Sequence, residues 1–182
     1  MRRKTLAFEL LTPHASRLTG VPVPSRFRLL LIISAVVLVL DQATKLYIDS
    51  RFALHQSLTV VENFFHITYV RNKGAAFGIF ADSAVRIPFF ITVSIAAAIG
   101  IIWYLHRLNE QQRLLHVALS LIFAGAVGNL IDRIRLGEVI DFIDVHWYQY
   151  HWPAFNIADS AITVGVGILL LDLWREERKK KA

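Results

Sequence analysis

Four long apolar segments constrain the fold of this chain more than any other feature of the sequence. They cover residues 27–48, 85–105, 114–131 and 157–174. Each approaches the roughly 20 residues that a helix needs to cross a bilayer, and helix is required there because lipid offers backbone groups no hydrogen-bond partners. The composition, 55% hydrophobic and 19% charged, is too apolar for an ordinary soluble domain of 182 residues. The sequence therefore predicts a mostly α membrane protein with four transmembrane helices.

Basic residues are concentrated in segments that would lie on one side of the membrane. Residues 1–28, 107–113 and 175–181 hold 13 of the 20 Lys and Arg residues. Since cytoplasmic loops are rich in Lys and Arg, both termini are predicted to be cytoplasmic. The net charge of +6 is then explained by topology and by contact with anionic lipid. No nucleic-acid partner is expected.

We divide the chain into three parts. Residues 1–25 form a cytoplasmic arm whose prolines oppose helix, residues 26–176 form the membrane domain, and residues 177–182 form a basic cytoplasmic tail. The first apolar segment is followed by "DQATKLYIDS", which lacks a small-x-small cleavage site. It is therefore interpreted as a retained helix rather than a cleaved signal peptide.

Two segments are predicted to face outward. In the first, about residues 50–84, "SLTVVENFFHITYV" is β-branched and aromatic with a polar break at Glu62 and Asn63, which is typical of a β-hairpin. The second, about residues 132–153, is predicted to be a loop. Its aromatic residues suit the level of the lipid headgroups; they are Trp147, Tyr148, Tyr150 and Trp152.

Two acids in apolar surroundings are candidates for catalysis. Asp141 would lie in the second outer loop and Asp159 in the first turn of the fourth span, both near the outer face. Acids at a membrane are costly and are usually functional. Two close carboxyls share one proton and can activate water against an amide bond. The alternative is that "NIAD", residues 156–159, is a helix N-cap in which Asp159 only stabilises the helix.

Other polar residues also interrupt the apolar segments. Asp41 and Lys45 are four apart, as in a surface ion pair worth about 0.3–0.5 kcal/mol, yet they sit where lipid would penalise an idle pair. Asp132 and Arg133 are interpreted as a structural ion pair at the interface. Asn129 is predicted to hydrogen-bond across helices.

Asn72 could cap a turn or hold a substrate carbonyl, and the sequence leaves both open. The seven histidines form no HExxH motif and the chain has no cysteine, so neither a metal nor a cofactor is predicted. His146 and His151 are assigned to the membrane interface.

Four motifs, in this order, resemble those of the bacterial lipoprotein signal peptidase (signal peptidase II) family. They are "DQATK" at 41–45, "NKGAAFG" at 72–78, "GNLIDR" with "GEVIDF" between 128 and 142, and "FNIADSAI" at 155–162. The resemblance runs from Phe27 to the basic tail. It implies a membrane aspartyl endopeptidase of the inner membrane with a small extracytoplasmic β-sheet cradle. Such an enzyme removes the signal peptide from diacylglyceryl-modified prolipoproteins, cutting before the lipidated cysteine at the outer face.

The resemblance also implies roles for particular residues. Its two catalytic aspartates match Asp141 and Asp159, and Asp144 lies outside the pattern. The implied partners are lipidated prolipoproteins and membrane lipids, and a monomer is expected. Residues implied to bind substrate or support the catalytic pair are Asp41, Lys45, Asn72, Gly74, Asn129, Asp132, Arg133 and Asn156.

Three alternatives from other classes remain. A small transporter or proton channel would more often carry acids at the midplane with internal repeats, whereas here no repeat is visible. A serine–lysine peptidase would use Ser160 and Lys45. A structural scaffold would leave the polar residues at one interface unexplained.

Overall fold

The computed structural model describes residues 24–74 and 85–181, so the predicted arm, residues 1–25, lies almost wholly outside the described residues. Four of its helices are long and apolar enough to cross a membrane, which confirms the predicted spans. The last helix runs to Lys181, so the basic residues up to 181 continue this helix. The elements are α1 Ser25–Arg51, β1 Ser57–Val61, β2 Phe65–Asn72, α2 Arg86–Arg107, α3 Arg113–Leu136, β3 Val139–Trp147, β4 Tyr150–His151 and α4 Ile157–Lys181.

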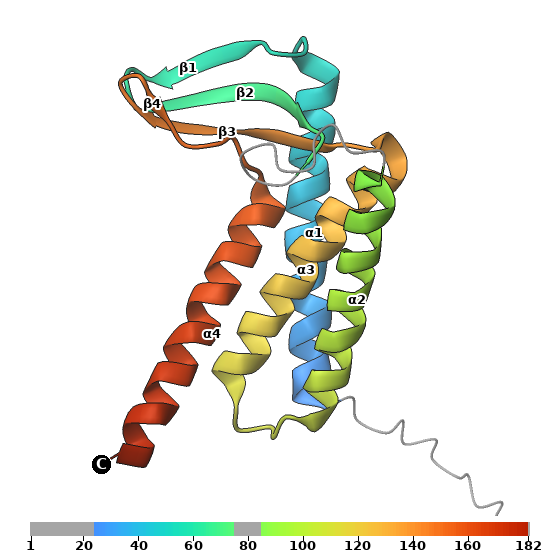
Figure 1. The fold of residues 1–182 in the computed structure, drawn as a ribbon, viewed down its shortest axis with the longest axis vertical. Coiled ribbons are helices and arrows are strands. Elements are labelled where there is room, and N and C mark those ends of the chain that lie inside the picture. The colour runs from blue at the N-terminus through green and yellow to red at the C-terminus, as the bar shows by residue number, and fades with distance from the viewer. Residues whose placement is uncertain (1–23, 75–84, 182) are drawn as a thin grey trace, which may run out of the picture.

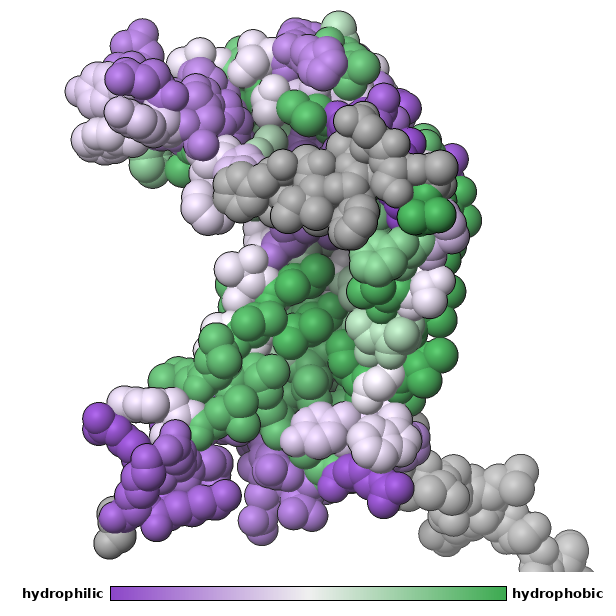
Figure 2. Space-filling view, in the orientation of Figure 1, coloured by the Kyte–Doolittle hydropathy of each residue, from purple (hydrophilic) through white to green (hydrophobic). Residues whose placement is uncertain are grey.

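The helices form a bundle with the sheet at one end (Figure 1). Helix α3 packs against α1, α2 and α4. The start of α1 and the end of α4 both lie at the end of the bundle opposite the sheet (Figure 1). Figure 2 shows an apolar band over the helices, with hydrophilic residues above and below it. This pattern is expected of a protein whose middle contacts hydrocarbon.

The sheet is antiparallel, with strand order β1-β2-β3-β4. Strands β1 and β2 form the predicted hairpin, and its turn contains Asn63 with a φ of 59°. The prediction of a second outer loop was wrong, because Val139–Trp147 is strand β3, paired with β2. Residues 139–142 of this strand are all buried, so the sequence lacks the alternation of apolar and polar residues by which a half-exposed strand is recognised.

The sheet is fixed to the bundle through the end of α1. The Tyr69 hydroxyl donates a hydrogen bond to the Asp49 carboxylate, and the Arg71 guanidinium donates to the same carboxylate at 3.0 Å. Burial and the Asp49 hydrogen bond raise the pKa of Tyr69 above its usual value, so the hydroxyl stays a donor. Tyr69 and Arg71, which bind Asp49, lie on β2 just before Asn72. Their contacts therefore fix the position of Asn72.

Two glycines allow α3 to approach its neighbours closely. A Cβ at Gly125 would lie 2.3 Å from the Ala158 carbonyl oxygen, and one at Gly128 would lie 2.7 Å from Asp41 Oδ2. Small residues permit such close helix packing in membranes. The close contact of α3 with α4 brings Asn129 next to the first turn of α4.

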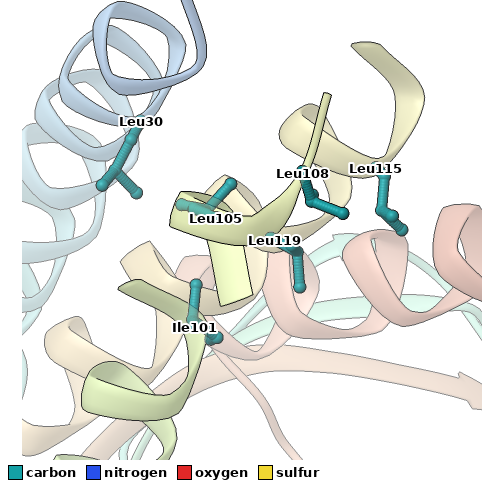
Figure 3. Close-up of a cluster of buried hydrophobic side chains, with 6 residues drawn as sticks. All are labelled: Leu30, Ile101, Leu105, Leu108, Leu115 and Leu119. Carbon is teal, nitrogen blue, oxygen red and sulfur yellow. The ribbon is translucent and has the colours of Figure 1, made fainter. Parts of the chain in front are cut away.

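At the other end of the bundle lies a cluster of buried aliphatic side chains (Figure 3). Its side chains come from α1, α2, α3 and the link between α2 and α3. The buried members are Leu30, Ile101, Leu105, Leu108, Leu115 and Leu119.

Candidate active site

Asp141 is held in strand β3 by two amide side chains. It pairs with Val70 of β2, which places it near Asn72 at the end of that strand. Asn72 Nδ2 donates to Asp141 Oδ2 at 3.0 Å, and Asn156 Nδ2 donates to Asp141 Oδ1 at 2.7 Å. Only 1% of the Asp141 surface is exposed. Each oxygen of this buried carboxyl therefore has an amide donor.

Asp159 lies in the first turn of α4 and has two sets of contacts. Its Oδ2 accepts from the Asn156 backbone N–H at 3.3 Å, and Asn156 Oδ1 accepts from the Asp159 N–H at 2.9 Å. This reciprocal pair is a capping box, so the predicted N-cap is confirmed. Its Oδ1, however, accepts from Asn129 Nδ2 at 2.7 Å. The cap therefore accounts for only one of the two oxygens.

Asn156 connects the two acids. It is fully buried. Its Nδ2 contacts Asp141 Oδ1, and also lies 3.2 Å from both Asn129 Oδ1 and the Ile140 carbonyl oxygen. Its backbone and Oδ1 bind Asp159. One asparagine thus fixes the relative placement of two carboxyls that are 18 residues apart in the sequence.

The environment of Asp141 favours its neutral form. Burial, and secondly the charge of Asp159, raise the pKa of Asp141 from 3.8 to about 7, against the opposing hydrogen bonds from Asn72 and Asn156. Loss of solvation disfavours a carboxylate, and so does a second negative charge. At neutral pH this acid can therefore hold or release a proton.

A buried ion cluster lies behind the aspartate pair. Lys45 Nζ is 2.9 Å from Asp41 Oδ2 and 3.0 Å from Asp132 Oδ2, and it donates to Asn129 Oδ1 at 3.0 Å. The exposed fractions of these three charged side chains are at most 1%. Asp41 and Lys45 are therefore more than an ordinary ion pair, because the Asp132 carboxylate of α3 and the Asn129 amide also bind the ammonium.

Each carboxylate of this cluster also binds the backbone beside one acid of the pair. Asp41 Oδ1 accepts from the Ala158 N–H at 3.0 Å, and Ala158 directly precedes Asp159. Asp132 Oδ2 accepts from the Ile140 N–H at 3.2 Å, and Ile140 directly precedes Asp141. The cluster therefore positions both acids through their main chains.

Gln42 is a member of this cluster that the sequence did not reveal. Its Nε2 lies 3.0 Å from Asp41 Oδ2, 3.2 Å from Asp132 Oδ1 and 3.3 Å from the Gly128 carbonyl oxygen. It lies next to Asp41 within "DQATK", and this adjacency is the only signal that could have identified it.

The prediction that Asp132 pairs with Arg133 was wrong. The cation beside Asp132 is Lys45, because adjacent helix residues do not face each other. Arg133 turns toward the Phe90 ring, 4.7 Å from its centroid, and donates to the Gly74 carbonyl oxygen at 3.4 Å. Gly74 in turn donates its N–H to Asn72 Oδ1 at 2.9 Å. Asn72 therefore caps a turn, as one of its two readings predicted.

The arrangement does not form a serine–lysine pair. The Ser160 hydroxyl donates to the Asn156 carbonyl oxygen at 2.9 Å. The Lys45 ammonium has three donors, and all three have oxygen partners in the cluster. This lysine is a buried cation and not a free base.

Ten residues were predicted for the site, and all are described by the structure. Eight of them form one network of hydrogen bonds and ion pairs; Gly74 and Arg133 join it through Asn72 and the Asn129 carbonyl oxygen. Within residues 24–74 and 85–181, no group of three or more His, Asp or Glu side chains is arranged to hold a metal ion. The chemistry that these residues offer is general acid–base catalysis by two carboxyl groups held by one asparagine.

Comparison with known sequences identifies a family. A sequence model described as "Signal peptidase (SPase) II" matches residues 33–175. The chain is 54% identical over 158 residues to a lipoprotein signal peptidase of Syntrophotalea carbinolica, covering 87% of this chain and 98% of the relative. It is 58% identical over 152 residues to one of Geobacter sulfurreducens, covering 82% and 95% respectively.

Solved structures are similar as well. A bacterial membrane enzyme structure obtained by the in meso method at 2.3 Å resolution is similar with a TM-score of 0.76 and 37% identity, covering 83% of this chain and 90% of that one. A second, at 1.9 Å resolution, has a TM-score of 0.72 and 36% identity, covering 79% and 91%. Helix bundle and sheet therefore both belong to a known membrane-enzyme fold.

Proposed function

We propose, from the premise that this chain belongs to the lipoprotein signal peptidase (signal peptidase II) family, that it cleaves by an aspartyl mechanism in which Asp141 and Asp159 are the catalytic residues. Membership of the family makes the chain a membrane-bound protease with four spanning helices. The observation that supports the catalytic assignment is the shared asparagine: Asn156 hydrogen-bonds both carboxyl groups. Besides burial, the charge of Asp159 raises the pKa of Asp141, as expected of two neighbouring carboxyls that cannot both ionise easily and share one proton.

In the proposed reaction the pair works on one water molecule. The ionised carboxyl removes a proton from water as its oxygen bonds to the scissile carbonyl carbon, while the protonated carboxyl donates its proton to the carbonyl oxygen. The tetrahedral intermediate then collapses. Its C–N bond breaks, the nitrogen takes a proton from the pair, and a hydroxyl proton returns to the other carboxyl. The pair ends with the single proton that it had at the start.

The remaining residues are assigned to positioning. Asn72 and Asn129 each donate to one acid, at 3.0 and 2.7 Å. The buried cluster of Asp41, Lys45 and Asp132 holds the two backbones, so the acids have little freedom to move apart. Catalysis depends on such fixed placement of the reacting groups. Arg133 and Gly74 are proposed to border the peptide.

The proposed substrate is a prolipoprotein whose cysteine already carries diacylglycerol, cut on the amino side of that cysteine. Its acyl chains stay in the bilayer, so the scissile bond comes to the ends of the helices, where the aspartate pair lies. Figure 2 shows the molecule hollowed beneath the overhanging sheet, above the apolar helix surface. Peptide held under the sheet and acyl chains along the helices would fit this shape.

We place the protein in the bacterial inner membrane with the sheet outside and both termini in the cytoplasm. The basic residues in the last turn of α4 lie at the end of the bundle opposite the sheet (Figure 1). Excess Lys and Arg marks the cytoplasmic side.

The test is cleavage of a purified diacylglyceryl-modified prolipoprotein, followed by a gel shift. Asp141→Asn and Asp159→Asn are expected to lower turnover by at least about a thousandfold, as loss of a catalytic acid or base does. The matched control is Asp172→Asn, which lies 13 residues beyond Asp159 on α4 and about 20 Å away. Ser160→Ala is expected to keep its activity. Near-normal turnover by a folded Asp141→Asn or Asp159→Asn variant would contradict the mechanism.

A further inference from the structure

Three histidines and one aspartate cluster on the sheet, away from the aspartate pair. His66 of β2 pairs with Asp144 of β3, and His146 of β3 pairs with His151 of β4. The His146 and His151 rings stack with centroids 4.5 Å apart. His66 and His146 come from two different strands and are 80 residues apart, so a motif search along the sequence could not pair them.

The two closest histidines point the same nitrogen at each other. His66 Nε2 and His146 Nε2 are 3.2 Å apart. His146 Nδ1 lies 2.9 Å from the Tyr148 carbonyl oxygen, which can only accept, so the His146 ring proton is on Nδ1. His66 Nδ1 faces Asp144 Oδ2 at 3.6 Å, too far for a hydrogen bond, but the charge of the carboxylate favours a proton on the nitrogen that faces it.

With the proton of each neutral ring on Nδ1, the two Nε2 lone pairs would point at each other. That arrangement is repulsive unless a positive charge lies between them. Two nitrogens bound to one metal ion at about 2.0–2.1 Å, with a tetrahedral angle, lie about 3.3 Å apart. The observed separation of 3.2 Å matches this value. Metal-binding histidines also commonly donate their other N–H to a backbone carbonyl or a carboxylate, and His146 Nδ1 has such a contact with the Tyr148 carbonyl oxygen.

We propose that His66 and His146 bind one divalent transition-metal ion of the class that prefers imidazole, such as Zn²⁺, Ni²⁺ or Cu²⁺. The site has two protein ligands, since no group of three is arranged around a metal position in the described part of the chain. Water completes the coordination. The site opens into a hollow of about 440 Å³ whose other lining residues are Thr59, Glu62, Asn63, Tyr148 and His151.

The backbone on both sides of this hollow is held in place. Tyr148 and Asn63 have φ values of 51° and 59°, a conformation that an aromatic residue adopts at a cost. The Tyr148 N–H donates to the Asn63 carbonyl oxygen at 3.2 Å, and the His146 N–H donates to the Phe64 carbonyl oxygen at 2.9 Å. These bonds join the β1–β2 turn to β3 and keep the two histidines together.

The metal would stabilise the free end of the sheet and take no part in peptide cleavage. His146 is five residues from Asp141 along β3, which is about 16 Å in an extended strand. This is too far for the ion to touch the reacting atoms. Binding can be measured without substrate, so its outcome is separate from that of the proposed peptidase function.

The experiment is calorimetric titration of the full chain, purified without a polyhistidine tag, with Zn²⁺ at pH 7.5. One saturable site is expected. His66→Gln and His146→Gln each remove one nitrogen and keep a polar side chain of similar size. Each is expected to lower the affinity by at least about tenfold. His106→Gln, a change to an exposed histidine on α2, is the matched control and is expected to bind as the wild type does.

A second measurement covers the case in which a variant does not fold. Electron paramagnetic resonance of Cu²⁺ bound to the wild-type chain should show coupling to two imidazole nitrogens. Absence of saturable Zn²⁺ binding, equal affinity in the folded histidine variants, or a copper spectrum without nitrogen coupling would each overturn the proposal. A shared proton would then be the cation between His66 and His146.

Discussion

At one end of the helix bundle Leu30, Leu105 and their aliphatic neighbours pack together (Figure 3); at the other end, next to the sheet, Asp41, Lys45 and Asp132 are buried just as completely. Lipid is as apolar as leucine, so burial of aliphatic side chains between membrane helices depends on how well they fit. Burial of charges is costly unless each is paired and hydrogen-bonded. The first cluster therefore tolerates other apolar side chains of suitable shape, while the second depends on the identity of each residue.

The polar end retains this costly arrangement because it positions the aspartate pair. Each carboxylate of the ion cluster binds one backbone N–H adjacent to an acid, at Ala158 and at Ile140. An aliphatic replacement could fill the same space but could not make those bonds. The comparison therefore separates side chains that maintain the fold from side chains that maintain the site.

Removal of the buried cation should have the largest effect. Lys45→Met leaves the Asp41 and Asp132 carboxylates buried without a counter-charge, and is expected to cost about 3–5 kcal/mol of unfolding free energy as well as peptidase activity. The matched control is Lys73→Met, whose side chain is 57% exposed and 3.9 Å from Glu138; it should cost less than about 1 kcal/mol. Unfolding in detergent measures both. Equal stability of the two variants would show that the buried ion cluster does not depend on the charge of Lys45.

A helix contact near the site should be the next most sensitive feature. Gly125→Ala would place a Cβ 2.3 Å from the Ala158 carbonyl oxygen, so α3 and α4 must separate; overpacking of this kind costs about 1–3 kcal/mol. Gly167→Ala on α4 meets nothing within 4 Å and should be neutral or slightly stabilising. Thermal unfolding of the two variants compares them directly. A Gly125→Ala protein as stable as Gly167→Ala would show that the helices do not need this close approach.

Truncation at the aliphatic end should lower stability without changing the site. Leu105 is fully buried, so Leu105→Ala leaves a cavity. We expect a cost of about 2 kcal/mol, at the low end for such changes, because transfer from water contributes little inside a membrane. The turnover per folded molecule should stay within a factor of about two, a difference of less than 0.5 kcal/mol. A loss of turnover larger than the loss of folded protein would mean that this end also shapes the site.

The pH dependence of the free energy of unfolding should show the smallest effect, when it is measured over a single pH unit. Because the pKa of Asp141 is raised to about 7 in the folded protein and is near 3.9 when unfolded, the folded state binds more protons between these values. The free energy of unfolding should therefore fall as pH rises from about 4 to 7, by about 1 kcal/mol per pH unit. Asp141→Asn should make this slope smaller. Denaturant unfolding at pH 5, 6 and 7 measures it, and an unchanged slope in the variant would assign it to other groups.

The sequence predicted the spans and the hairpin because both rest on local patterns. Apolar length alone identifies α1–α4, and "SLTVVENFFHITYV" carries a strand–turn–strand pattern that became β1 and β2. Strand β3 was taken for a loop because both faces of residues 139–142 are buried. Its partner, β2, is distant in the sequence, and no local pattern predicts that these two strands pair.

The sequence predicted which residues form the site, but not which of them contact one another. Motifs named Asp132 and Arg133 together, whereas their side chains leave α3 in different directions, one to Lys45 and one to Phe90. Gln42 was missed because a glutamine next to a charged residue carries no chemical signal of its own. The His66 and His146 pair was missed because 80 residues separate its members.

The central claim is that Asp141 and Asp159 share one proton during peptide cleavage, and the dependence of kcat/KM on pH tests it most directly. Cleavage of the lipidated substrate would be followed from pH 4 to 9 in detergent, at a temperature where the protein stays folded throughout. We expect a bell-shaped profile with two apparent pKa values that belong to the pair. Its alkaline limb should begin near pH 7, where Asp141 loses its proton, and fall about tenfold per pH unit. A rate that stays level or rises between pH 6 and 9 would contradict proton sharing and, with it, the aspartyl mechanism proposed for this site.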